Sequence, residues 1–286
     1  MLPDFYIIGA MKCGTSTLQA QLARLPGVFM CEPKEPQFFS DPEVWAKGMG
    51  WYEGLFADAA PGQLVGEAST HYTKYPDLPD APARVAAATP DAKLIYCVRD
   101  PIKRALSHYR HEWTQGVAKG GPERAARDMD ALWQYGSYDM QLARWLEHFD
   151  AGRVLIVSLE RLNADPDAEF ARVLDFLGTE GAWAHDQAPQ NRSDERIRRL
   201  PMHGLIYDNP VAAAVRRAVV PQAVRTKLAE ARRPKPVTFS GEAVSYLTEK
   251  LEEDAAAFGA RVGVPGLTVG GWKEAVLGTQ LELRGG

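Results

Sequence analysis

The chain has 286 residues, which is enough for one large domain or for one domain with an appended lobe. Apolar residues make up 45% of it and charged residues 24%, as in an ordinary soluble globular protein. The net charge of −4 argues against a nucleic-acid-binding protein with a basic face, so a polyanionic ligand would need a local cluster of cations.

The three cysteines, Cys13, Cys31 and Cys97, are too widely spaced for a disulfide framework or a CxxC metal pair. They favour a reducing, cytoplasmic location. The first residues lack the basic and apolar regions of a signal peptide, and no stretch approaches the roughly 20 apolar residues of a membrane helix. We therefore expect no stable membrane insertion, and a monomer and a homodimer both remain open.

The first 25 residues predict a strand, a short loop and a helix. Residues 5–8 are an apolar run typical of a strand, and residues 9–14 form a loop with a glycine at each end. From Thr15 onward, leucines recur at helical spacing. At such a junction, backbone N–H groups and the positive end of the helix dipole converge on an anion. The side chains suit an anion as well, with a cation at Lys12 and hydroxyls at Thr15, Ser16 and Thr17.

The loop differs from a Walker A motif in the place of its lysine. G-x-x-x-x-G-K-[ST] has the lysine directly after the second glycine, where this chain has Thr15. An ATPase needs that lysine on the β- and γ-phosphates and a hydroxyl on Mg²⁺. A lysine at position 12 instead favours a nucleotide that has its anionic group at the 5′ end and binds without a metal ion. A plain glycine turn before a core helix is the alternative.

This stretch resembles the 5′-phosphosulfate loop of the PAPS-dependent sulfotransferases, including the heparan-sulfate type and the bacterial small-molecule and carbohydrate enzymes. PAPS is 3′-phosphoadenosine 5′-phosphosulfate. The resemblance implies that the loop residues bind the 5′ end of PAPS, namely Lys12, Cys13, Gly14, Thr15, Ser16 and Thr17.

Residues 28–39 are expected to form an ordered loop, because two prolines three residues apart forbid a regular helix. Lys34 and Glu35 lie between these prolines, and an exposed ion pair is the plain alternative to a functional pair. Glu35-Pro36-Gln37-Phe38-Phe39 resembles the Glu-x-x-Phe-Phe setting of the catalytic base in heparan-sulfate-type sulfotransferases, as does Gly50-Trp51-Tyr52. The resemblance implies that Glu35 is the base, and we expect Lys34 to contact the acceptor. Burial would raise the pKa of Glu35 toward neutrality.

Residues 64–72 predict a second strand that ends in polar residues, which in an open α/β sheet line the ligand crevice. The family pattern has a lysine that contacts substrate where this chain has Ala68, which argues against a highly anionic glycan. His71 and Tyr72 are candidates for acceptor contact, and His71 is either a second base or a histidine at the rim. Four aromatic residues either line an apolar acceptor pocket or belong to the core: Trp51, Tyr52, Tyr72 and Trp113.

Residues 92–98 are a continuous apolar run typical of a central parallel strand, and a helix begins at Pro101. Arg99 at the strand tip presents a planar fork of donors that suits a phosphate dianion. An Arg99–Asp100 pair that caps the helix is the alternative. Arg99-Asp100-Pro101-x-x-Arg104-x-x-Ser107 resembles the 3′-phosphate motif of sulfotransferases, which implies that Arg99 and Ser107 hold that phosphate.

His111 follows Ser107 by four residues and therefore shares its helical face. It matches the active-site histidine of the N-sulfating subgroup, and a surface histidine is the alternative. Residues 116–130 predict a mobile excursion. Further along, Arg192 and Ser193 lie in a basic loop that either closes over the nucleotide or is a solvated surface. Residues 201–240 predict short helices of a lid, and residues 241–263 a C-terminal helix.

The alternation of strands and helices predicts a three-layer, P-loop-like α/β fold with a central, mainly parallel sheet and a C-terminal helical lobe. We expect one domain over residues 1–286, with the PAPS-binding core at 1–199 and the lid and closing segment at 200–286.

The resemblance implies in-line transfer of a sulfuryl group from PAPS to a hydroxyl of a small molecule, lipid or glycan, without a metal. Its catalytic residues would be Glu35, Lys12 and His111. The alternatives are a kinase-like phosphotransferase with a degenerate Walker A loop and a non-catalytic protein that binds PAP, the desulfated product.

Overall fold

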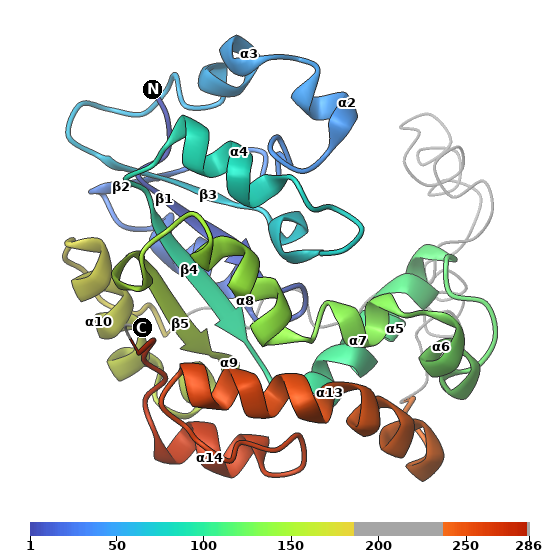
Figure 1. Cartoon of the computed structure of the whole chain (residues 1–286). Helices are drawn as coiled ribbons and strands as arrows, with labels where there is room; N and C mark the ends of the chain where they lie inside the picture. The colour runs from blue at the N-terminus through green and yellow to red at the C-terminus, as the bar shows by residue number, and fades with distance from the viewer. Residues whose placement is uncertain (186–236, 285–286) are drawn as a thin grey trace, which may run out of the picture.

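The central sheet has five parallel strands in the order β2-β3-β1-β4-β5 (Figure 1). The structure is a computed structural model that describes residues 1–185 and 237–284. Every residue of β1 is buried, because β1 is the middle strand and helices cover both faces of the sheet. The strands are β1 (Phe5–Gly9), β2 (Val28–Met30), β3 (Leu64–Ala68), β4 (Lys93–Val98) and β5 (Val154–Ser158).

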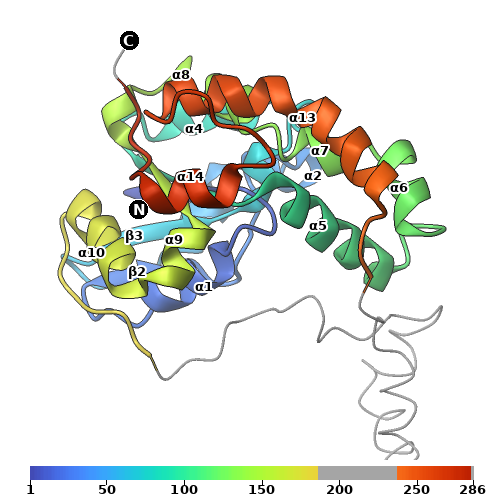
Figure 2. The ribbon, with the colours of Figure 1, turned by 90° about the horizontal axis from the view of Figure 1, so that it is seen from below.

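Two groups of helices sandwich this sheet, which confirms the predicted three-layer fold. In Figure 2, α4 (Ala81–Ala88) and α8 (Tyr138–Leu146) lie on one side, and α1 (Thr15–Leu22) and α10 (Pro166–Leu177) lie on the other. The other elements of this part of the chain are α2 (Pro42–Trp45), α3 (Met49–Gly54), η1 (Thr70–Thr73), α5 (Pro101–Gln115), α6 (Pro122–Asp128), α7 (Ala131–Gln134), η2 (Ala151–Arg153) and α9 (Leu159–Ala164).

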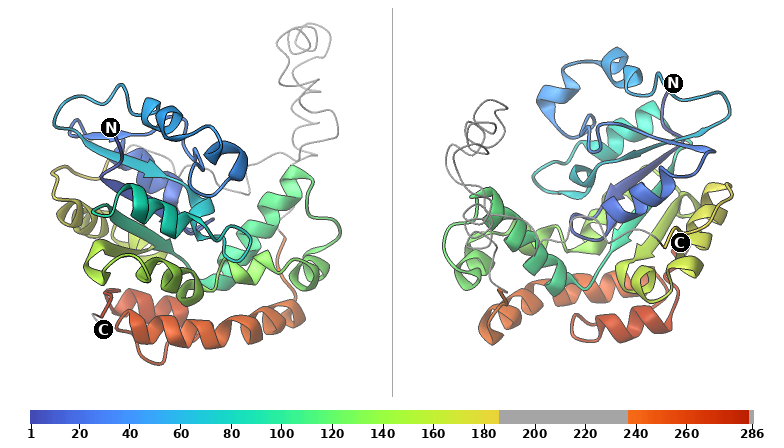
Figure 3. Two further views of the ribbon diagram at one scale, coloured as in Figure 1. Left: turned by 45° about the horizontal axis from the view of Figure 1, so that its top comes forward. Right: turned by 180° about the vertical axis from the view of Figure 1, so that it is seen from behind.

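The C-terminal region is helical, as expected, and packs on the rest of the fold. Helix α13 (Gly241–Arg261) runs alongside α8 and also contacts α5, α6 and α7, as the left view of Figure 3 shows. Helix α14 (Trp272–Gly278) contacts α9. Among the described helices, none has the length and apolarity needed to cross a membrane. The basic loop at 190–199 and most of the expected lid at 201–240 lie outside the described residues.

Two segments differ from the expectations. Residues 28–30, expected to be loop, form the edge strand β2, in which Val28 lies opposite Leu64 of β3. Residues 122–128, expected to be mobile, form α6, whose Ala125 and Ala126 are buried in a cluster with residues of α5 and α13. In both cases a partner distant in the sequence stabilises the element, and local periodicity does not reveal that partner.

Candidate active site

The predicted site residues of the described chain follow the carboxyl ends of four neighbouring strands. Residues 10–14 follow β1, the Glu35 loop follows β2, η1 follows β3, and Arg99 follows β4. Because all strands run in the same direction, these segments meet at one edge of the sheet (Figure 1).

The turn between β1 and α1 leaves backbone donors for an anion. The N–H groups of Thr17 and Leu18 donate to the Gly14 carbonyl at 3.0 and 3.1 Å. Those of Gly14, Thr15 and Ser16 donate to no carbonyl oxygen among the described residues. Donors at the start of a helix stabilise a phosphate or a sulfate, so the turn fits the 5′ end of PAPS.

Two side chains of this turn are buried. The Thr15 side chain is buried, and the Cys13 thiol is buried at 3.5 Å from the Tyr138 hydroxyl. Only the backbone of Cys13 can therefore contact a nucleotide. The half-buried side chains in the turn are those of Lys12, Ser16 and Thr17.

Gly14 has a specific steric reason to be glycine. Its φ of 88° is left-handed, and a Cβ atom there would lie 2.7 Å from Cδ1 of Leu159. Helix α1 can therefore begin close to α9 only because this residue has no side chain.

Arg99 connects the end of β4 to the turn after β1. Its guanidinium donates to the Lys12 carbonyl at 3.3 Å, so the two expected anion-binding segments lie side by side. Asp100 is the N-cap of α5, since its carboxylate accepts from the Lys103 N–H at 3.0 Å. The capping alternative thus applies to Asp100, whereas the Arg99 guanidinium points to the turn. Ser107 lies on α5 with 8% of its surface exposed.

The second arginine of the motif has a structural place that the sequence did not reveal. Arg104 is fully buried and donates to the Leu132 carbonyl, and its guanidinium lies 3.4 Å from Nδ1 of His108. It thereby connects α5 to α7. His111 lies one turn beyond Ser107 and is half-buried.

Three hydrogen bonds fix Glu35 beside the end of β3. Its N–H donates to the Ala68 carbonyl at 3.0 Å, and its Oε1 lies 2.6 Å from Nζ of Lys34. Its Oε2 accepts a 3.0 Å hydrogen bond from the Thr70 hydroxyl. Sequence reasoning did not identify Thr70, because its partner is 35 residues away.

The pKa of Glu35 departs from its ordinary value in the direction opposite to the one expected. Burial raises it, but the charge and hydrogen bond of Lys34 and the hydrogen bond of Thr70 lower it more, so the net pKa is lowered. The expectation was wrong because it counted burial alone. Glu35 is therefore a carboxylate at neutral pH and can accept a proton.

The side chain of Tyr72, which was expected to contact an acceptor, lies in the core. With 2% of its surface exposed it is a core residue, and its ring packs against Tyr6 and Phe39 at centroid distances of 6.4 and 6.0 Å. Tyr52 is also buried, while 36% of the Trp51 surface is exposed. The strand tip therefore presents His71 rather than Tyr72.

Burial favours the uncharged forms of both His71 and Glu67. Burial and the nearby Lys74 charge lower the pKa of His71 to about 4, so its imidazole is uncharged at pH 7. Burial raises the pKa of Glu67 to about 7 although Ser69, Tyr52 and Tyr72 donate to its carboxyl group. Among the described residues, Glu67 Oε1 and His71 Nδ1 are buried without a hydrogen-bond partner.

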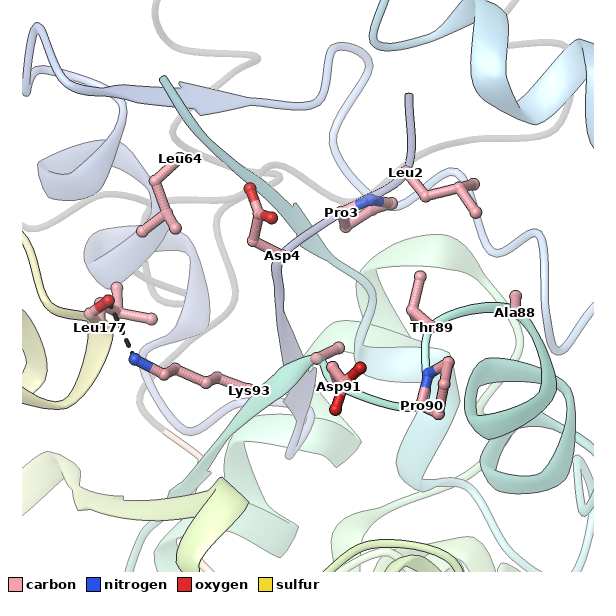
Figure 4. Close-up of a pocket in the computed structure, with 11 residues that line it drawn as sticks. Leu2, Pro3, Asp4, Leu64, Ala88, Thr89, Pro90, Asp91, Lys93 and Leu177 are labelled. Atoms are coloured by element: carbon pink, nitrogen blue, oxygen red, sulfur yellow. Dashed lines mark hydrogen bonds between the residues drawn. The ribbon is translucent and has the colours of Figure 1, made fainter. Parts of the chain in front are cut away.

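A surface cavity of about 480 Å³ lies at the opposite, amino edge of the sheet (Figure 4). Its polar side chains are already engaged, since Lys93 donates to the Leu177 carbonyl at 3.1 Å and Asp4 accepts from the Val65 N–H at 2.8 Å. This cavity is therefore distinct from the candidate site. In residues 1–185 and 237–284, no three His, Cys, Asp or Glu side chains are grouped to hold a metal ion. Arg192 and Ser193 lie outside the described residues.

Comparison with known proteins gives the family. The family model of the sulfotransferase domain matches residues 2–202. The chain belongs to this family. It is 38% identical over 192 residues to heparan sulfate glucosamine 3-O-sulfotransferase 3B1 of Mus musculus. The aligned region covers 62% of this chain and 46% of that protein. It is 30% identical over 199 residues to the bifunctional heparan sulfate N-deacetylase/N-sulfotransferase 2 of Homo sapiens, with coverage of 62% and 22%. The chain thus spans less than half the length of these curated relatives.

Solved structures agree with the fold. A sulfotransferase from Alicyclobacillus acidocaldarius superposes with a TM-score of 0.59 at 27% identity, covering 68% of this chain and 89% of that one. A mouse sulfotransferase crystallised with PAP gives a TM-score of 0.50 at 16% identity, with coverage of 88% and 83%, and shows the shared fold alone.

The expected cytoplasmic location was wrong, because the heparan sulfate sulfotransferases that the chain matches are Golgi-lumenal enzymes. The location was inferred from the cysteines, but Cys13, Cys31 and Cys97 are all buried free thiols. Burial protects a thiol in any compartment, so these residues carry no information on the redox environment.

Proposed function

We propose that this chain transfers a sulfuryl group from PAPS to a hydroxyl or amine of an acceptor. One observation carries the proposal: Arg99 bonds to Lys12 across the ends of β4 and β1, at the edge where Glu35 also lies. Sulfuryl transfer from PAPS requires one anion-binding segment for the 5′-phosphosulfate, a second for the 3′-phosphate, and a base such as a carboxylate.

The donor side consists of the β1–α1 turn and the start of α5. The N–H groups of Gly14, Thr15 and Ser16 and the Lys12 ammonium would hold the 5′-phosphosulfate, and Arg99 with Ser107 would hold the 3′-phosphate. Lys12 would also stabilise the charge that develops on the departing phosphate oxygen.

On the acceptor side, Glu35 would take the acceptor proton as the oxygen or nitrogen attacks sulfur and the bond from sulfur to the 5′-phosphate oxygen breaks. The products are the sulfated acceptor and PAP. Because Glu35 is ionised and Thr70 fixes one of its oxygens, the carboxylate is oriented before the acceptor arrives. His111, on the same face of α5 as Ser107, remains a second candidate for proton transfer.

We propose a glycan or another hydroxyl- or amine-bearing molecule as the acceptor class, because the matched relatives are named for heparan sulfate. Lys34 and His71 are the proposed acceptor contacts in the described residues. We also propose that residues 1–286 form a single domain, in which the PAPS-binding core ends near residue 199 and the lid and closing segment follow.

Isothermal titration with PAP tests the proposal, with ATP plus Mg²⁺ as the comparison and Arg99→Ala as the variant. We expect micromolar binding of PAP, weak binding of ATP, and a large loss of PAP affinity in Arg99→Ala. Preference for ATP with Mg²⁺ would instead favour the kinase-like alternative. PAP binding without turnover of any acceptor in a screen would favour the non-catalytic one.

A further inference from the structure

We propose that Tyr138 is a positioning residue that holds the 5′- and 3′-phosphate segments in register, and that α13 fixes Tyr138 in place. The identity of the ligand rests on the proposed function, but the geometry of Tyr138 does not. Tyr138 is the first residue of α8 and has 1% of its surface exposed.

The Tyr138 hydroxyl makes two hydrogen bonds to the Arg99 backbone and contacts the Cys13 sulfur. It donates to the Arg99 carbonyl at 2.6 Å and accepts from the Arg99 N–H at 3.2 Å. The Cys13 sulfur lies at 3.5 Å. The Cys13 thiol also donates to the Met11 carbonyl at 3.8 Å, so its contact with the phenol is a second, weaker interaction of this side chain. Burial raises the pKa of Cys13 to about 11, so the thiol keeps its proton at neutral pH.

Arg99 needs such a partner because of its place in the chain. It lies between the end of β4 at Val98 and the start of α5 at Pro101, so neither element bonds its backbone groups. Tyr138 pairs both of them. Loss of the hydroxyl leaves both groups without that partner, and the backbone that aims the guanidinium at Lys12 becomes less constrained, although the Asp100 N–H still donates to Glu160 Oε1 at 2.9 Å.

Helix α13 holds the start of α8 from outside the matched domain, which ends at residue 202. Ser137 makes no side-chain cap for α8. Asp254 does so instead, accepting from the N–H groups of Asp139 and Met140 at 3.1 and 2.8 Å. Arg261 pairs with both oxygens of Asp139 at 2.5 and 3.1 Å.

Aromatic packing fixes the Tyr138 ring from the same side. The rings of Phe258 and Trp272 lie 5.7 and 5.3 Å from it, centroid to centroid. The C-terminal helices thus support a side chain that contacts both expected anion-binding segments.

The chain offers a matched control for Tyr138→Phe. Tyr96 is also buried, its ring is 6.0 Å from that of Tyr138, and its hydroxyl has no hydrogen-bond partner among the described residues. Tyr96→Phe therefore removes a buried phenol oxygen without breaking a hydrogen bond.

Two measurements test the proposal. Hydrogen exchange of the Arg99 amide in the ligand-free protein should be at least tenfold faster in Tyr138→Phe than in Tyr96→Phe. The Kd for PAP and the KM for PAPS should rise about tenfold in Tyr138→Phe, the loss expected from about 1.4 kcal/mol of hydrogen bonding, while the acceptor KM stays constant. Asp254→Ala, which leaves the phenol in place, should give a smaller change in the same direction.

Equal exchange rates in the two phenylalanine variants would overturn the positioning role whatever the ligand proves to be. Equal rises in the KM of donor and acceptor would overturn it too, because they indicate general loosening. Lack of PAP binding by the wild-type protein would contradict the proposed function alone, and the exchange measurement would still decide the role of Tyr138.

Discussion

The hydroxyl of Thr70 donates a 3.0 Å hydrogen bond to Oε2 of Glu35, and so connects the end of β3 to the loop after β2. This bond stabilises the ionised carboxylate and is one cause of its lowered pKa. In Thr70→Val the pKa of Glu35 should rise. Because the proposed base must be ionised, the acidic limb of the kcat/KM profile should move to higher pH.

Thr70→Ser retains the hydroxyl and should restore the position of that limb. A profile that is the same in the wild type, Thr70→Val and Thr70→Ser would contradict a role of this hydrogen bond in the reaction.

Glu35→Gln should lower kcat at least about 100-fold, the usual effect of removing a general base. The Kd for PAP should stay the same, because Glu35 lies on the acceptor side of the site. Single-turnover assays with titration of PAP measure both quantities. Glu32→Gln, at an exposed neighbouring carboxylate, is the control. Turnover of Glu35→Gln at the rate of this control would remove Glu35 from the mechanism.

Glu67 makes the stability of the protein depend on pH. Its pKa is about 7 in the folded protein against an ordinary value of 4.5, so the folded state binds this proton more tightly than the unfolded state. The stabilisation is therefore complete below pH 4.5 and is lost as the pH rises through 7. Glu67→Gln does not titrate, so its stability relative to wild type should increase by about 3 kcal/mol between pH 4.5 and 7.5.

Urea unfolding at several pH values measures this difference, with Glu53→Gln, an exposed glutamate in α3, as the control. Parallel curves for wild type and Glu67→Gln would show that Glu67 is ionised in the folded protein.

Gly14→Ala should destabilise the protein and weaken PAP binding. The alanine pays about 1–2 kcal/mol for a left-handed backbone, and its Cβ also meets Leu159 at 2.7 Å. Gly116→Ala is the matched control, because Gly116 is also left-handed, with a φ of 80° and a ψ of 9°, and has nothing within 4 Å of the added Cβ. The difference between the two losses of unfolding free energy measures the clash. Gly14→Ala together with Leu159→Ala should remove that difference, and equal losses in the two single variants would show that α9 moves away freely.

The sequence predicts those parts of the fold that local pattern determines. The apolar runs at 5–8 and 92–98 correspond to strands β1 and β4, and Pro101 is the first residue of α5. The three residues of β2 carry too little pattern, and only pairing with β3 makes them a strand. Helix α6 likewise depends on its contact with α13.

The site was predictable where a residue acts through its own backbone neighbourhood and unpredictable where it acts through distant partners. The Gly14 turn belongs to the first kind. The lowered pKa of Glu35, the buried place of Tyr72 and the hydrogen bonds of Tyr138 belong to the second, because Thr70, Phe39 and Arg99 are between 33 and 39 residues away in sequence. Hydrophobicity alone did not distinguish Tyr72 in the core from Trp51 at the surface.

The strand order has a consequence for how such a chain can diversify. The strands β2 and β3, with the proposed acceptor-facing Glu35 loop and η1, form one uninterrupted stretch of sequence at one side of the sheet. The proposed donor-binding segments follow β1 and β4, which lie before and after that stretch. Recombination could therefore exchange residues 28–73 as a single cassette and alter acceptor choice while the nucleotide-binding half is inherited unchanged. The cassette would have to keep Gly66, since a Cβ there would lie 2.2 Å from the Phe5 ring of β1.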